Sequence, residues 1–283
     1  MTAEPRSWLF VPADSDRKIA KALDSAADAI IFDLEDSVVP AQKHAAREIL
    51  RGLEPRANGP SWWVRVNPLA SEYLKDDLEV LANSGIHGIV LPKAESGADV
   101  VELSHRTGNI PIHAIVTETA ASLFGLMSYR LPNSPLVAMS WGAEDLSAAL
   151  GAASKHGPDG SLSFTYQMAR SLCLAGAVAA GVQPVDGVFA DFKDEDGLRA
   201  ETEAAAREGF TGKLAIHPAQ VAVINAAFSP STDDIAHAEA IVAAFEAEPN
   251  AGVLSVGGKM VDRPHLIQAA RILERMRSLP KGG

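Results

Sequence analysis

Residues 29–35 read Ala-Ile-Ile-Phe-Asp-Leu-Glu, a short apolar run that stops among acidic side chains. An uninterrupted apolar run is typical of a strand buried on both faces of a parallel sheet, because an exposed face would make every second residue polar. Similar runs recur along the chain. Besides Ala29–Glu35, they predict strands at Ser7–Pro12, Trp62–Asn67, Gly88–Lys93, Ile112–Thr119, Leu136–Trp141, Pro184–Asp191 and Lys213–Pro218.

Segments with apolar residues about 3.6 positions apart lie between these strands and predict amphipathic helices. Examples are Asp16–Ala27, Ala41–Leu53, Tyr73–Asn83 and Asp194–Glu208. Eight alternations of strand and helix favour a closed barrel, because an open sheet would need fewer strands and would leave edges to protect. The predicted fold class is therefore α/β, a (β/α)8 TIM barrel with a C-terminal helical extension.

Helical patterns follow the eighth predicted strand. They cover Ala219–Phe228, Asp233–Ala247 and Pro264–Arg277, with a glycine-rich turn at Gly257-Gly258. No linker rich in proline, glycine or serine precedes them. We predict a catalytic barrel at residues 1–228, and at 229–283 an extension that packs on the barrel or on a neighbouring subunit.

Composition excludes several functional classes. The 283 residues include 36 acidic and 25 basic ones, and this acidic balance argues against nucleic acid as a partner. The single cysteine, Cys173, allows no internal disulfide, and its apolar neighbours predict a buried thiol. The N-terminus lacks a signal-type segment, and no apolar run reaches about 18 residues, so we expect a cytoplasmic protein with no membrane span.

Carboxylates follow two of the predicted strands. Glu118 closes the fifth run, and Glu144 and Asp145 follow the sixth. A parallel barrel places successive strand ends on one rim, where two carboxylates can bind Mg²⁺ and leave other positions to water and substrate. Either residue alone could instead mark a helix N-terminus. Together they predict a metal site made of Glu118 and Asp145.

Three acids, Asp33, Glu35 and Asp36, end the second predicted strand. So many carboxylates repel one another unless a cation or an arginine lies among them, which places Glu35 and Asp36 in the predicted catalytic group. Arg65, near the end of the third strand, needs an anionic partner. That partner is either a substrate carboxylate held by two parallel hydrogen bonds or a salt bridge to Glu35 or Asp36.

Two further features lie near the ends of the first and last strands. Arg17 and Lys21 fall on one face of a helix, which is either a site for a phosphate-bearing ligand or an ordinary solvated surface. His217 ends the eighth strand, just before Pro218. No second histidine lies at metal-ligand spacing, so we predict that His217 forms a hydrogen-bonding wall of the substrate pocket.

Six segments in order resemble the citrate lyase beta-subunit-like (CitE-like) family, which includes malyl-CoA and citramalyl-CoA lyases and belongs to a wider group of Mg²⁺-dependent aldolases. The segments are RSWLFVP at 6–12, IFDLEDSV at 31–38, VRVN at 64–67, LPKAE at 91–95, GAEDL at 142–146 and AIHP at 215–218. The resemblance covers nearly the whole chain. It implies a Mg²⁺-dependent barrel that cleaves or forms a C–C bond in a 3-hydroxyacyl-CoA, such as citramalyl-CoA or malyl-CoA. Cleavage gives acetyl-CoA and a 2-keto acid, and formation joins them.

The resemblance also implies roles for individual residues. Matching positions in the family bind the metal (Glu118 and Asp145), the keto-acid carboxylate (Arg65) and coenzyme A (Arg17 and Lys21). Residues 258–264, GKMVDRP, are similar to the family segment whose aspartate reaches an adjacent subunit's site as the acid/base. That similarity implies a catalytic Asp262 and a homotrimer or hexamer.

Two alternatives remain open from the sequence. One is a keto-acid aldolase that does not require CoA, although such enzymes carry a histidine where this chain has Asp36. The other is the beta subunit of a citrate lyase complex. Phe10 stands where some CoA lyases have tyrosine, which leaves the acyl group open.

Overall fold

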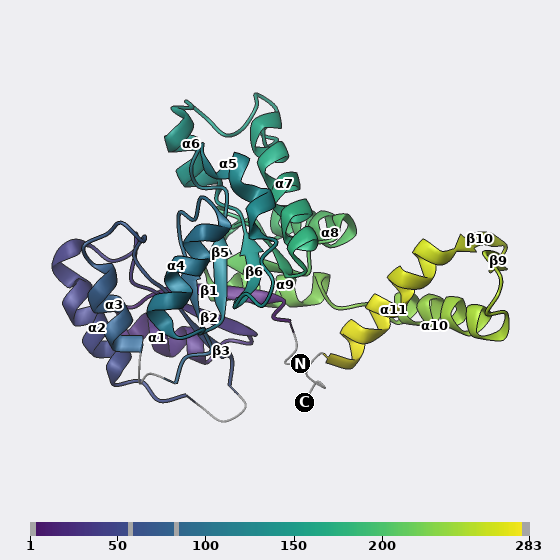
Figure 1. Ribbon diagram of the computed structural model, residues 1–283, viewed down its shortest axis with the longest axis horizontal. Coiled ribbons are helices and arrows are strands. Elements are labelled where there is room, and N and C mark those ends of the chain that lie inside the picture. Colours follow the sequence, from purple (N-terminus) through teal and green to yellow (C-terminus); the bar gives the residue numbers. More distant parts are fainter. Residues whose placement is uncertain (1–3, 56–58, 82–84, 279–283) are drawn as a thin grey trace. The chain divides into compact units, whose positions relative to one another are not determined.

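A computed structural model describes residues 4–55, 59–81 and 85–278 of the chain. They form two compact units. One runs from Pro5 to Asn225, and the other contains Glu4 and the residues from Ala226 onward. The larger unit is a closed barrel of parallel strands surrounded by helices, so the predicted TIM barrel is confirmed (Figure 1).

The barrel strands pair in chain order, and β8 pairs with β1 to close the sheet. The strands are β1 Ser7–Pro12, β2 Ala29–Asp33, β3 Ser61–Arg65, β4 Gly88–Leu91, β5 Ile112–Ile115, β6 Leu136–Ser140, β7 Gln183–Asp186 and β8 Gly212–Ala215. The helices that begin in this unit are α1 Asp16–Leu23, η1 Pro40–Gln42, α2 Lys43–Arg51, α3 Leu74–Leu81, α4 Gly97–Thr107, α5 Ser122–Gly125, η2 Leu126–Tyr129, α6 Ala143–Leu150, α7 Phe164–Ala180, α8 Glu195–Glu208, η3 Pro218–Gln220 and α9 Val221–Ala227.

Most strands end earlier than the apolar runs that predict them. β5 ends at Ile115, whereas the run continues to Thr119, and Val116, Thr117 and Glu118 remain buried. Burial thus continues beyond the end of the strand, so an apolar run overestimates strand length. The first two predicted helices are also too long, and Asn83, the predicted end of the third, lies outside the described residues.

The barrel interior is filled by side chains from every strand. This cluster consists of Trp8, Ala29, Ile31, Trp63, Val90, Ile115, Ala138, Val185 and Leu214. The Trp8 and Trp63 rings meet edge to face with centroids 4.9 Å apart. A Cβ at Gly88 would lie 2.1 Å from the Trp63 ring, so the absence of a side chain at position 88 makes room for the indole. The interior is therefore a packed core.

A buried ionic network joins the last strands to α7. The carboxylate of Asp186 in β7 accepts hydrogen bonds from Trp141 Nε1 (2.7 Å), Arg170 Nε (2.8 Å) and Lys213 Nζ (3.0 Å). Burial alone would raise the pKa of Asp186, but Lys213 and Arg170 outweigh it and the pKa is lowered to about 2. A buried charge of this kind is tolerated because its partners replace the water it has lost.

Asp186→Asn should lower the free energy of unfolding at neutral pH by about 3 to 5 kcal/mol, because it breaks a buried ion pair. The folded pKa lies below the ordinary value of 3.8, so the Asp186 carboxylate stabilises the protein above about pH 4 and ceases to do so as pH falls toward 2. Urea unfolding between pH 2 and 7 should show the gap between wild type and variant shrinking in that window. A gap that does not change with pH would contradict this account.

The C-terminal unit is a helix pair with a small hairpin. It contains α10 Thr232–Ala247, β9 Val253–Val256, β10 Lys259–Asp262 and α11 Arg263–Ser278. The turn at Gly257 and Gly258 is confirmed, and both residues have positive φ (58° and 78°), which glycine adopts without strain. The hairpin itself was not predicted, because two four-residue strands leave too short a pattern to recognise. How this unit packs stays a prediction.

Cys173 is buried and free, as predicted. Among the described helices, none combines the length and apolar character needed to cross a bilayer.

Candidate active site

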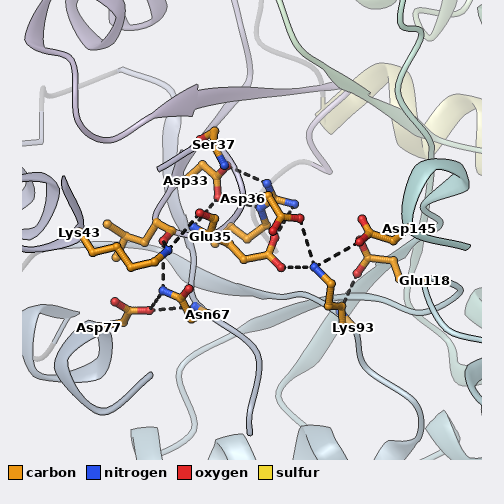
Figure 2. A network of polar contacts seen from close by, with 12 residues as sticks. Asp33, Glu35, Asp36, Ser37, Lys43, Asn67, Asp77, Lys93, Glu118 and Asp145 are labelled. Atoms are coloured by element: carbon orange, nitrogen blue, oxygen red, sulfur yellow. Dashed lines mark hydrogen bonds and ion pairs between the residues drawn. The ribbon is translucent and has the colours of Figure 1, made fainter. Parts of the chain in front are cut away.

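Carboxylates from several elements converge at the carboxyl ends of the barrel strands (Figure 2). Asp33 is the last residue of β2, and Glu35 and Asp36 follow it. Glu118 lies in the loop after β5, and Asp145 lies in the first turn of α6. The structure thus brings together five acidic side chains that are up to 112 positions apart in sequence.

Arg65, the last residue of β3, is held by two of these carboxylates. Its Nε and Nη2 donate to the two oxygens of Asp33, each at 2.7 Å, and Nη1 forms an ion pair with Glu35 Oε2 at 2.9 Å. Phe10 lies under the guanidinium, 4.8 Å from it. The salt bridge to Glu35 is observed, whereas Asp36 pairs with Lys93 instead (3.1 Å). Asp33 therefore occupies the Nε–Nη2 edge of the guanidinium and Glu35 contacts Nη1, so these two acids fix its orientation.

Burial and ion pairing set the pKa values of these acids. Burial alone would raise the pKa of Asp33, but the Arg65 guanidinium reverses this and the net shift is downward. Burial raises the pKa of Glu35, and Arg65 and Lys93 only partly oppose it. Burial raises the pKa of Glu118 to about 8, and Asp145 adds to the shift. Glu118 therefore holds its proton more tightly than an ordinary glutamate, mainly because it is buried.

Glu118 is fixed from two sides. Oε2 accepts a hydrogen bond from the backbone N–H of Lys93 (2.5 Å). A Cβ at Gly142 would lie 2.8 Å from Glu118 Cγ, so the glycine leaves room for the glutamate. These constraints hold the buried carboxylate beside Asp145.

The donor set fits a divalent cation. Five carboxylates face the cations of Arg65 and Lys93, so three negative charges remain in excess when all are ionised. Hard carboxylate oxygens are the ligands that Mg²⁺ prefers, and it keeps several waters. Within the described ranges, no three His, Cys, Asp or Glu side chains converge as a metal cage. The protein would therefore supply few ligands, and water or substrate the others.

A cavity of about 490 Å³ lies between α1 and the turn after β8. Lys21 and His217 both line it, so the structure brings these two predicted residues together. The His217 ring stacks on Phe192 with centroids 4.7 Å apart. Arg17 is exposed on α1 and is not part of this lining.

A second cavity, of about 500 Å³, opens beside the carboxylates. Glu35, Asp36 and Lys93 line one part of it, and Lys43 and Tyr73 line another. The ammonium of Lys43 donates to the carbonyl oxygens of Leu34 (2.7 Å) and Glu35 (3.1 Å), which fixes the turn after β2. A small ligand in this cavity would contact the acidic side chains directly.

Asp262 lies in the other unit, at the end of β10. Its Oδ1 is 2.5 Å from Nδ1 of His265, and this hydrogen bond holds the pKa of the aspartate below its ordinary value. The placement of Asp262 relative to the barrel carboxylates, and hence its catalytic role, stays a prediction.

Lys93 is a site residue for which the sequence predicts no role. Its ammonium contacts Glu35, Asp36 (3.1 Å) and Asp145 (3.3 Å). The position of this lysine, two residues after β4 in a barrel with acidic residues at other strand ends, is a pattern that could have indicated a site residue. The sequence does not predict its left-handed backbone conformation (φ 52°).

Comparisons with known proteins identify the family of this chain. Residues 6–218 match the family model described as HpcH/HpaI aldolase/citrate lyase, and residues 164–279 match that of a C–C bond lyase of the TIM-barrel fold. The (3S)-malyl-CoA thioesterase of Cereibacter sphaeroides is 39% identical over 97% of this chain and 95% of its own length. A citrate lyase subunit beta-like protein of Mycobacterium tuberculosis is 40% identical over 95% and 94%.

Solved structures show the same likeness. CitE from M. tuberculosis in complex with magnesium, acetoacetate and coenzyme A is 38% identical, covers 97% of this chain and 98% of its own, and superposes with a TM-score of 0.84. The M. tuberculosis citrate lyase beta subunit complexed with oxaloacetate and magnesium is 40% identical over 79% of this chain and 96% of its own, with a TM-score of 0.72. The chain therefore belongs to the HpcH/HpaI aldolase/citrate lyase family and is CitE-like.

Proposed function

We propose that this protein is a Mg²⁺-dependent lyase. It cleaves a 3-hydroxyacyl-CoA, such as citramalyl-CoA or malyl-CoA, into acetyl-CoA and a 2-keto acid, or forms the 3-hydroxyacyl-CoA from them. The observation that carries the proposal is the convergence of Glu118 and Asp145 beside the oriented guanidinium of Arg65. The magnesium, acetoacetate, oxaloacetate and coenzyme A bound by the solved relatives support the same chemical class.

Each residue has a defined task in this proposal. Glu118 and Asp145 would hold Mg²⁺, which when bound supplies positive charge to stabilise developing negative charge on oxygen. Arg65, oriented by Asp33, binds the carboxylate of the keto-acid half. Asp262 takes the proton of the 3-hydroxyl group, the C–C bond breaks, and its electron pair passes into the thioester enolate. Protonation of the enolate carbon then gives acetyl-CoA.

The cavity at Lys21 and His217 is our candidate for the coenzyme A end of the substrate. Replacing Arg17 and Lys21 with alanine should raise KM for the CoA ester by about tenfold and make it less dependent on salt, with a smaller change in kcat. Lys75→Ala, at an exposed position on α3, controls for the loss of a positive charge outside this cavity. An unchanged KM in the double variant would return this helix face to ordinary solvated surface.

The decisive assay compares purified protein and Mg²⁺ with citramalyl-CoA, malyl-CoA and citryl-CoA, beside free citramalate and malate. Keto acid and acetyl-CoA should form from a thioester and not from the free acids. Comparable rates with the free acids would indicate the CoA-independent aldolase. Inactivity toward all substrates would favour a subunit that works only inside a citrate lyase complex.

Thioester hydrolysis is a second candidate, favoured by the 39% identical (3S)-malyl-CoA thioesterase. The two reactions give different products from malyl-CoA. Hydrolysis releases malate and free CoA thiol, whereas C–C cleavage releases glyoxylate and acetyl-CoA. Measuring thiol and glyoxylate in the same reaction therefore distinguishes them.

A further inference from the structure

Lys93 occupies the centre of the carboxylate cluster (Figure 2). Its ammonium contacts Glu35 and Asp36, which follow β2, and Asp145, which belongs to α6. Its backbone N–H binds Glu118. One residue thus contacts both candidate metal ligands and both acids beyond β2.

The backbone of Lys93 is unusual for its residue type. Its φ of 52° lies in the left-handed region, and in the described part of the chain the other non-glycine residues with positive φ are Asn109 and Asn133. Asparagine tolerates this conformation, whereas lysine does so at a cost. The left-handed turn points the N–H at Glu118 while the side chain reaches Glu35 and Asp145. Such strain persists where surrounding contacts enforce it.

We propose that the ammonium of Lys93 acts as a counter-cation within the carboxylate cluster and lowers the affinity of the cluster for a divalent cation. Without the divalent ion, the ammonium neutralises part of the carboxylate charge. When a divalent cation binds to Glu118 and Asp145, the ammonium repels it and competes for Asp145. The inference rests on the proposed function, because it takes these two residues as the metal ligands.

The expected effect follows from charge. A unit charge beside a carboxyl group commonly shifts its pKa by about one to three units. The free energy of repulsion between such a charge and a dication in the same cluster should be at least as large. Lys93→Met removes the charge at nearly constant side-chain length. The Kd for Mn²⁺, used as a probe of the site, should therefore fall about tenfold in Lys93→Met.

The experiment titrates full-length protein with Mn²⁺, without substrate, and counts free Mn²⁺ by electron paramagnetic resonance. Lys93→Gly is measured beside Lys93→Met, because glycine also lacks the ammonium and relieves the left-handed backbone. Lys93→Arg keeps the charge and should retain the wild-type Kd. Lys75→Met makes the same change in net charge at a lysine whose side chain is 84% exposed, and should also leave Kd unchanged. Adding Glu118→Gln to Lys93→Met should abolish the tighter binding.

Thermal unfolding gives a second readout. Metal-free Lys93→Met should unfold at a lower temperature than wild type, since its carboxylates repel, and saturating Mn²⁺ should close that gap. An unchanged or higher Kd in both folded Lys93 variants, with normal binding by wild type, would overturn this inference and leave the proposed function intact. Failure of the wild type to bind Mn²⁺ would overturn both.

Discussion

Turnover is expected to fall by more than about a hundredfold when Asp145 is replaced by asparagine. Mutating a residue that only orients a metal ligand typically lowers metal affinity or activity by about 10- to 100-fold, and losing a ligand itself should lower activity further. Glu118→Gln should have the same effect. Asp145 lies at the rim and is partly exposed, so the fold should persist in its variant. Glu118 is buried, but glutamine keeps its shape.

The measurement pairs kcat at saturating Mg²⁺ with direct Mn²⁺ titration of the same preparations. Glu144→Gln is the matched control, because Glu144 adjoins Asp145 in the first turn of α6 but pairs with Lys155 outside the cluster. The control should keep wild-type kcat and Kd. Full activity of wild type in excess EDTA would sink the metal assignment.

Asp262→Asn should lower kcat by about 10² to 10⁴, the range contributed by a positioned acid or base. Mn²⁺ binding should stay near normal, because Asp262 lies outside the predicted metal ligands. Asp233→Asn, an exposed aspartate in the first turn of α10, controls for charge in the same unit. Equal activity of Asp262→Asn and wild type would remove Asp262 from the mechanism.

A stronger test asks whether Asp262 serves a neighbouring subunit in the predicted homotrimer or hexamer. Co-expression of Asp262→Asn with Asp145→Asn chains should restore partial activity, since some sites in mixed oligomers then contain both intact residues. Asp145 suits this test better than Arg65, because removing the guanidinium would leave Asp33 buried without its ion-pair partner and Glu35 paired with Lys93 alone. Mixed oligomers that assemble but stay inactive would disprove the shared site.

Local sequence pattern was sufficient for the main architecture. Most barrel strands lie in buried, largely apolar runs, and a strand such as Ala29–Asp33 is recognisable within a window of a few residues. Once the runs are counted, barrel topology places Glu118 and Asp145 on one rim without any knowledge of side-chain contacts. The glycine turn at Gly257 and Gly258 was also readable, because positive φ favours that residue.

The contacts within the site were decided by tertiary structure. The register of β2 against β3 places Asp33 opposite Arg65. The ammonium of Lys93 contacts Glu35, which follows β2, and Asp145, which lies in α6. These partners are 32 to 58 positions apart in sequence. The sequence by itself determined the barrel and the rim on which its acids lie, since both follow from short-range periodicity and strand order. Only the closed barrel decided which cation meets which carboxylate, because ion pairing depends on distances of a few ångströms between separate strands.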